Sequence, residues 1–136
     1  MQTHASHLLF SVRTENLPFY KDLMSFLGWS VLYEAEDILG VSDGSGLSLW
    51  FGAAAKDAPN DYDGPGLNHL GIGTSTQADV DATVAYLAER GVAPLFETPR
   101  HRPEFAGGAD DTYYQVMFET PDRLLLEVVY IGPKAA

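Results

Sequence analysis

Apolar residues alternate with polar or small ones in eight short segments. In two longer segments, apolar residues recur every three or four positions. Alternation places side chains on the two faces of a strand, whereas the longer spacing is typical of one face of a helix. Strands are expected at 7–13, 29–34, 38–42, 47–51, 69–74, 92–97, 113–119 and 124–130. Helices are expected from Leu17 or Pro18 to about residue 27, and from about residue 77 to Arg90. The order strand, helix, three strands therefore occurs twice.

The two halves also repeat their spacing. His7 lies 21 residues before Gly28, and His69 lies 22 residues before Gly91. Since each glycine follows an expected helix, the halves align from strand start to helix end. We expect an α+β fold of two tandem βαβββ modules, at about 5–55 and 67–132, joined by a linker at about 56–66. Together they form one domain over 1–136, in which the repeat places Trp50 and Glu127 at equivalent positions.

Capping residues and apolar stripes define the two helices. Asn16 is expected to cap the first helix, and Thr76 or Asp79 the second. The expected buried stripes are Phe19, Leu23, Phe26 and Leu27 in the first helix and Val80, Val84 and Leu87 in the second. A long loop is expected at 98–111.

Composition narrows the classes of partner. The chain has 136 residues, 46% hydrophobic and 20% charged, as in ordinary globular proteins. It has no apolar run near 20 residues, no signal-peptide pattern and no cysteine, so we expect a cytoplasmic protein without a membrane partner or a thiolate site. The net charge of −11 repels phosphate backbones, which argues against nucleic acid.

Glu127 is the residue that points to chemistry. It lies inside the apolar run Leu-Leu-Leu-Glu-Val-Val-Tyr, where a carboxylate must be paired, protonated or bound to a metal. His7 and His69 begin the first strand of their modules, and Gly71 and Gly73 leave the face of His69 bare. Two imidazoles and one carboxylate form a metal triad with open positions. Alternatively, Glu127 pairs with a base such as Arg123, and the histidines are polar strand ends.

Other polar residues are candidates for contact with a substrate. Tyr113, Gln115 and Met117 share one face of an expected strand, which we expect to line the pocket. The other face, with Tyr114, Val116 and Phe118, is expected in the core. Trp50 is also a candidate substrate contact. Arg100 and His101, next to Arg102, form a basic patch that either attracts an anionic substrate or balances local charge.

The pattern resembles the vicinal oxygen chelate superfamily, which includes glyoxalase I, methylmalonyl-CoA epimerase, extradiol dioxygenases, fosfomycin-resistance transferases and bleomycin-resistance proteins. The resemblance covers nearly the whole chain. It rests on His7-Leu8-Leu9-Phe10, on Phe19–Leu23 leading to Leu27-Gly28-Trp29, on Leu67–Ile72, and on Phe118–Glu127, which is similar to the family's F-x-D-P-D-G-x-x-L-E ending. It implies sheets that curl around a metal held by His7, His69 and Glu127. Extradiol members also use a tyrosine near the metal, so Tyr113 and Glu127 are the candidate catalytic residues.

The resemblance implies a divalent-metal enzyme that chelates vicinal oxygens of a small substrate. Dioxygenase-like chemistry at Fe²⁺ is favoured by the open triad, with Mn²⁺, Zn²⁺, Ni²⁺ or Co²⁺ as other metals. Glyoxalase I and the epimerase generally use a fourth metal ligand on the last strand of the first module. In this chain the repeat places Trp50 at that position. The alternatives are a fosfomycin-type thiol transferase, a glyoxalase or isomerase, and a non-catalytic drug-sequestering protein. Exposed sheet edges lead us to expect a homodimer.

Overall fold

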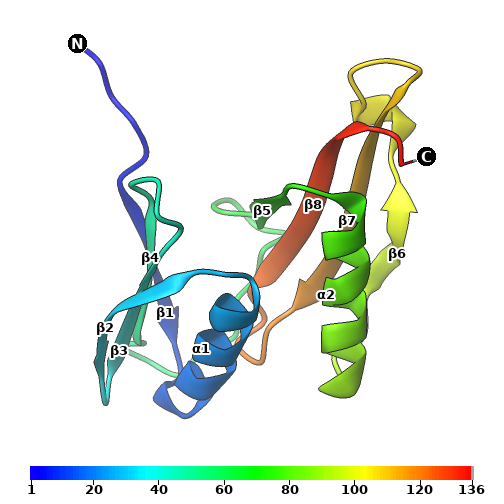
Figure 1. Ribbon diagram of the computed structural model, residues 1–136. Coiled ribbons are helices and arrows are strands. Elements are labelled where there is room, and N and C mark those ends of the chain that lie inside the picture. The colour runs from blue at the N-terminus through cyan, green and yellow to red at the C-terminus, as the bar shows by residue number, and fades with distance from the viewer. Residues whose placement is uncertain (136) are drawn as a thin grey trace. The chain divides into compact units, whose positions relative to one another are not determined.

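The computed structural model describes residues 1–135, and the first part of the chain forms a mixed four-stranded sheet in the order β1-β4-β3-β2 (Figure 1). Its strands are β1 (His7–Val12), β2 (Ser30–Ala35), β3 (Ile38–Ser42) and β4 (Ser48–Ala53). A short 3₁₀ turn, η1 (Thr14–Asn16), leads into helix α1 (Leu17–Phe26). β1 pairs parallel with β4, and the other neighbours are antiparallel.

The second part of the chain repeats this arrangement in the order β5-β8-β7-β6. Its strands are β5 (Leu70–Thr74), β6 (Leu95–His101), β7 (Asp111–Glu119) and β8 (Leu125–Pro133). Helix α2 (Gln77–Glu89) packs on this sheet, and a second 3₁₀ turn, η2 (Pro103–Phe105), follows β6 (Figure 1). The expected α+β fold of two βαβββ modules is therefore confirmed.

The strand register confirms the predicted equivalence of Trp50 and Glu127. Leu9 lies opposite Trp50 in the β1–β4 pair, and Gly71 lies opposite Glu127 in the β5–β8 pair. Leu9 and Gly71 each follow their module's histidine by two residues. Because a slip of one residue would turn every side chain to the other face, this register fixes the face on which both residues lie.

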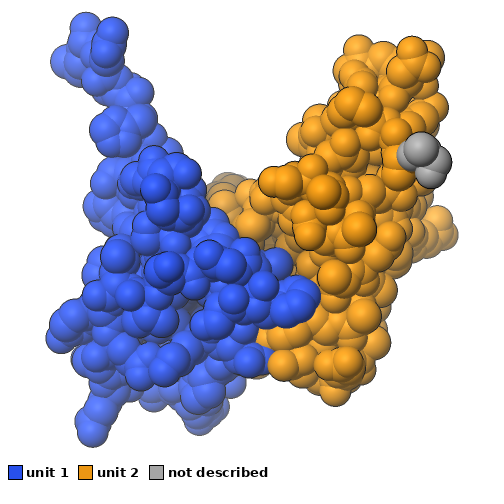
Figure 2. Space-filling view, viewed as in Figure 1, with its two compact units in different colours: residues 1–59 blue, residues 60–136 orange. Residues whose placement is uncertain are grey.

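The chain divides into two compact units, residues 1–59 and the chain from Asn60 onward (Figure 2). The division falls inside the expected linker. Each unit has its own sheet, helix and buried core. No helix among residues 1–135 is both long and apolar enough to cross a membrane.

The core of the first unit is built around Phe51. The ring of Phe51 stacks on Tyr20 at 4.4 Å and on Phe10 at 5.4 Å between ring centroids. In α1 the buried residues are Tyr20, Leu23 and Met24, whereas Phe26 is 42% exposed. Of the predicted stripe, Leu23 is buried as expected, whereas Phe26 is exposed, because the helix turns Tyr20 toward the sheet to stack on Phe51.

The core of the second unit lies between α2 and one face of its sheet. Val80, Thr83, Tyr86 and Leu87 are the buried residues of α2, so the predicted Val84 lies at the margin of the stripe. Val116, Phe118 and Val128 are fully buried, and the hydroxyl of Tyr114 donates to Asp81 at 2.6 Å. Burial and this hydrogen bond raise the pKa of Tyr114 to about 12, so its hydroxyl stays protonated. The predicted core face of β7 is thus observed.

The two predicted helix caps differ in outcome. Thr76 forms a capping box with Asp79: its hydroxyl accepts from the Asp79 amide at 3.2 Å, and its own amide donates to the Asp79 carboxylate at 3.1 Å. Asn16 makes no side-chain cap and belongs to η1. The prediction for Asn16 was wrong because the 3₁₀ turn gives it helical dihedrals, and a capping residue needs an extended backbone.

We expect Thr76→Ala to lower the free energy of unfolding by about 1 kcal/mol, since it removes the side-chain oxygen that accepts from the Asp79 amide in the first turn of α2. Asn16→Ala is the matched control and should change it by less than about 0.5 kcal/mol. Urea unfolding followed by circular dichroism measures both. Equal effects of the two substitutions would contradict the assignment of the cap.

The strand expected at 92–97 was misplaced. β6 begins at Leu95 and continues to His101, through the first residues of the expected loop at 98–111. Its pairing with β7 is irregular between Leu95 and Arg100, where Phe96 and Glu97 have positive φ and the Thr98–Pro99 peptide is cis. The irregularity interrupts the alternation of apolar residues, so the sequence pattern did not show that the strand continues.

Candidate active site

Glu127 lies in the middle of β8 and is only 3% exposed. Its neighbour on β5 is Gly71, and a Cβ atom added at Gly71 would lie 4.0 Å from the Glu127 carboxyl carbon. The glycine therefore leaves the space beside the carboxylate free. A carboxylate buried this deeply needs hydrogen-bond donors or a cation.

His69 comes directly before β5 and turns its imidazole toward that carboxylate. Its Nε2 lies 3.1 Å from Glu127 Oε2, and its Nδ1 lies 2.7 Å from Asn68 Oδ1. The amide nitrogen of Asn68 donates to the Tyr62 carbonyl oxygen at 3.0 Å, which orients the amide so that its oxygen accepts from His69. Nδ1 thus faces the Asn68 amide oxygen, and Nε2 is the ring nitrogen that faces the carboxylate.

Tyr113 holds the other oxygen of the carboxylate. Its hydroxyl donates to Glu127 Oε1 through a short hydrogen bond. Burial raises the pKa of Tyr113 to about 12, and the hydrogen bond to Glu127 and its negative charge act in the same direction, against the opposing charge of Arg102. Tyr113 is therefore a protonated donor at neutral pH, and Glu127 is fixed from both sides.

These three side chains lie at one cavity of about 510 Å³ in the second unit. Tyr113, Gln115 and Met117 all line it, so the structure places the predicted face of β7 at the cavity. Gln115 is 2% exposed. The remaining lining residues are Tyr62, Asp63, Asn68, Phe96, Arg102, Phe105 and Leu125. Half of the twelve lining residues are thus aromatic or apolar, and the other half are polar or charged.

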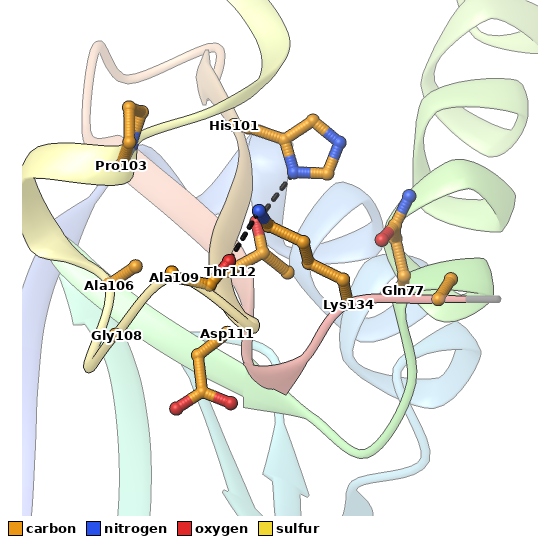
Figure 3. A pocket seen from close by; sticks show the side chains of 10 residues that line it. Gln77, His101, Pro103, Ala106, Gly108, Ala109, Asp111, Thr112 and Lys134 are labelled. Atoms are coloured by element: carbon orange, nitrogen blue, oxygen red, sulfur yellow. Dashed lines mark hydrogen bonds between the residues drawn. The ribbon is translucent and has the colours of Figure 1, made fainter.

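The structure does not bring His101 to this cavity. His101 pairs with Tyr114 in the β6–β7 register and packs on its ring at 4.6 Å. Its Nδ1 lies 2.5 Å from Thr112 Oγ1, and its ring borders a separate cavity of about 630 Å³ together with Lys134 and Gln77 (Figure 3). Because Tyr114 lies on the helix-covered face, His101 and Glu127 line different cavities.

Arg102, and not Arg100, is the residue of the predicted basic patch that lines the cavity. Arg100 pairs with Gln115 in register, but its Nη1 lies 3.5 Å from Glu97 Oε2 and it does not line the cavity. Arg102 lines it, and its backbone amide donates to the Tyr113 carbonyl oxygen at 2.7 Å. Arg102 belongs to the basic patch that the sequence predicts, but its position beside Tyr113 depends on the irregular pairing of β6.

His7 and Trp50 belong to the first unit. His7 begins β1, exposed, with its Nδ1 3.0 Å from Ser6 Oγ. Trp50 packs its ring on Gly40, where an added Cβ atom would lie 2.5 Å from the ring, and its Nε1 donates to Ser48 Oγ at 3.0 Å. The structure shows no cluster of three potential ligands among residues 1–135, but it does show the His69–Glu127 pair. The roles of His7 and Trp50 stay predictions.

Comparisons with known proteins agree with this architecture. No family model matches the sequence. A stretch of 64 residues is 39% identical to the uncharacterized protein YqjT of Bacillus subtilis, and it covers 47% of this chain and 46% of YqjT. The match thus spans about half the length of that curated relative.

Solved structures match over almost the whole chain. A candidate glyoxalase from Bacillus halodurans is 25% identical with a TM-score of 0.78, over 95% of this chain and 96% of that one. The chain has the glyoxalase/bleomycin resistance/dioxygenase fold. A domain described by these three names from Frankia sp. EAN1pec is 20% identical with a TM-score of 0.67, over 96% of this chain and 98% of that one. A glyoxalase/dioxygenase from Nostoc punctiforme is 15% identical with a TM-score of 0.69, over 96% and 92%.

The expected relationship to the vicinal oxygen chelate superfamily is therefore confirmed at the level of the fold. Within the glyoxalase/bleomycin resistance/dioxygenase fold, the two modules differ at one equivalent position. The second module carries Glu127 there, opposite Gly71, and the first carries Trp50, opposite Leu9. A carboxylate is thus present at this register position in one module only.

Proposed function

We propose that the protein is a divalent-metal enzyme of the vicinal oxygen chelate superfamily that acts on a small substrate with two vicinal oxygens. His69, Glu127 and His7 would hold the metal. A bound divalent ion would supply Lewis acidity toward those oxygens, and Fe²⁺, the favoured ion, would also supply dioxygenase-like chemistry. The observation that carries the proposal is the His69–Glu127 pair at the aromatic cavity.

The geometry of the pair supports a shared cation. Ligands of one ion at about 2.0–2.2 Å and at right angles lie about 3 Å apart, and the observed separation between Nε2 and Oε2 is 3.1 Å. Asn68 accepts from Nδ1, so Nε2 is the nitrogen left to bind a metal. A carbonyl or amide acceptor behind a ligating histidine is the usual way in which its tautomer is fixed.

The residues around the pair would position both metal and substrate. Tyr113 keeps its proton on Oη and donates it to Glu127 Oε1, which fixes the plane of the carboxylate. Gln115 is a buried amide at the cavity, able to donate to or accept from a substrate oxygen. The apolar walls would exclude water from the reacting group. A homodimer of this chain in the cytoplasm would be the working form.

A non-catalytic small-molecule binding protein is the second candidate, because the cavity is lined by four aromatic residues, Tyr62, Phe96, Phe105 and Tyr113. Such a cavity binds flat apolar compounds without any metal. Metal content distinguishes the two candidates, and so does turnover. Oxygen uptake would identify a dioxygenase, whereas thiol consumption would identify a transferase of the fosfomycin-resistance type.

The first test is the metal content per chain of protein purified without a chelator or an affinity tag. We expect near-stoichiometric divalent metal in the wild type and its loss in His69→Ala. His101→Ala is the matched control, because it removes a histidine from the other face of the same sheet, and it should keep the metal. Wild-type protein that stays metal-free after reloading with each candidate ion would move the assignment to the binding protein.

The role of His7 is tested by a double-mutant cycle on metal affinity. If His7 and Glu127 bind one ion, the effects of the two alanine substitutions on metal affinity should not be additive, since either substitution already disrupts the site. Mixing His7→Ala chains with Glu127→Ala chains adds a second readout. Recovery of metal binding in the mixture would show that partner chains share a site.

A further inference from the structure

The wall of the cavity carries an arginine that the metal chemistry does not use. Arg102 is the one lysine or arginine among the described residues that line the cavity. Its Nε donates to Glu104 Oε1 at 2.5 Å, and its side chain is 23% exposed. Among residues 1–135, Glu104 is the carboxylate that pairs with the Arg102 guanidinium. Nη1 and Nη2 therefore keep hydrogen-bond donors for a ligand.

Packing fixes where this charge lies. The Arg102 guanidinium carbon lies 4.8 Å from the centre of the Phe105 ring. Phe105 in turn meets Tyr113 edge to face at 5.4 Å, and Tyr113 donates to Glu127. One continuous wall thus runs from a guanidinium, over two aromatic rings, to the candidate metal ligands. A planar guanidinium held in this way is suited to bind a carboxylate through two hydrogen bonds.

The same cavity exposes apolar area that a ligand would cover. Phe96 is 53% and Phe105 is 55% exposed, and Met117 and Leu125 lie at the same cavity. Large aromatic side chains left open at a cavity favour a flat apolar ligand. Since the whole chain carries a net charge of −11, an anionic ligand needs a local cation to bind here.

We propose that the substrate is a small aromatic carboxylate, whose ring lies between the aromatic walls and whose carboxylate is bound by Arg102. This inference rests on the proposed function, because the metal-dependent reaction would take place at the end of the ligand opposite its carboxylate. Binding itself does not require the metal. Arg102 would thus determine specificity by selecting ligands with an anionic substituent.

The test compares two ligands of nearly the same shape, the anion 3,4-dihydroxybenzoate and its neutral amide, 3,4-dihydroxybenzamide. Dissociation constants are measured by calorimetry on chelator-treated and on metal-loaded protein. We expect the wild type to bind the carboxylate at least about tenfold more tightly than the amide, which is a free-energy difference of about 1.4 kcal/mol. In Arg102→Gln the ratio should fall to about two or less, while Arg90→Gln, a control outside the cavity, keeps it.

Each outcome of this test bears on the inference. A ratio near one in the wild type, a ratio unchanged in Arg102→Gln, or no saturable binding of the carboxylate at millimolar concentration would each overturn it. The comparison of the two ligands needs no variant, so a folding defect in Arg102→Gln leaves it decisive. If the protein failed to bind any metal but still bound the carboxylate more tightly than the amide, the role of Arg102 would be supported. The failure to bind metal would then refute the proposed enzyme separately.

Discussion

Glu127→Ala is expected to abolish stoichiometric metal binding and, with it, any metal-dependent turnover. The substitution removes the carboxylate that faces His69 Nε2 at 3.1 Å. Loss of a group behind a metal ligand typically costs about 10–100-fold in metal affinity, so loss of the ligand itself should exceed about 100-fold. Metal titration of the chelator-treated protein measures the affinity, and the assay identified from the wild type measures the turnover.

Two further variants separate ligation from positioning. Tyr113→Phe removes only the donor to Glu127 Oε1 and should weaken metal binding by about 10–100-fold without abolishing it. Glu119→Gln is the matched control, because Glu119 accepts from Tyr62 much as Glu127 accepts from Tyr113. It should retain the metal. If Glu127→Ala kept wild-type affinity, or if Glu119→Gln lost the metal equally, Glu127 would not be a ligand.

Phe51→Ala should produce the largest loss of stability among single substitutions in the first unit. The Phe51 ring is 2% exposed and lies between Tyr20 and Phe10. Removing a buried phenylalanine costs about 3–5 kcal/mol, because the apolar contacts are lost and a cavity remains. Since domains of this size are stable by about 5–15 kcal/mol, part of the protein should be unfolded at moderate temperature. Urea unfolding followed by circular dichroism tests this.

The control for Phe51 is the same substitution at an exposed position of the same unit. Phe26 in α1 is 42% exposed, and Phe26→Ala should cost clearly less than Phe51→Ala, because less of the Phe26 ring is buried and no enclosed cavity remains. A cost at Phe51 no larger than the cost at Phe26 would mean that the stacked rings do not form the core. Metal content of the Phe51 variant, measured below its unfolding transition, shows whether the second unit keeps its site.

The pattern of residues predicted much of the site within the second module. Alternation along 113–119 put Tyr113, Gln115 and Met117 on the cavity face and Tyr114, Val116 and Phe118 in the core, as observed. Successive side chains of a strand point to opposite faces, so a clear alternation along one strand predicts which residues lie on each face. His69 and Glu127, which the repeat assigned to one candidate site, lie 3.1 Å apart, and their role as metal ligands stays a prediction.

Other parts of the site depend on contacts between distant residues. The pattern did not predict that Asn68 orients His69, that β6 continues past Phe96, or that Arg102, rather than Arg100, reaches the cavity. Residues 95–101 take their course from pairing with β7 across an irregular register. A strand that pairs through such an irregularity carries no clear alternation of its own.

The sequence by itself thus determined the two βαβββ modules, the equivalence of Trp50 and Glu127, and the cavity face of β7. These features follow from local periodicity and from an internal repeat, both of which can be recognised in the sequence. Only the tertiary structure decided which helix face is buried, which basic residue lines the cavity, and how the carboxylate is held. Burial and charge pairing depend on residues far apart in sequence, so they are settled when the sheets form.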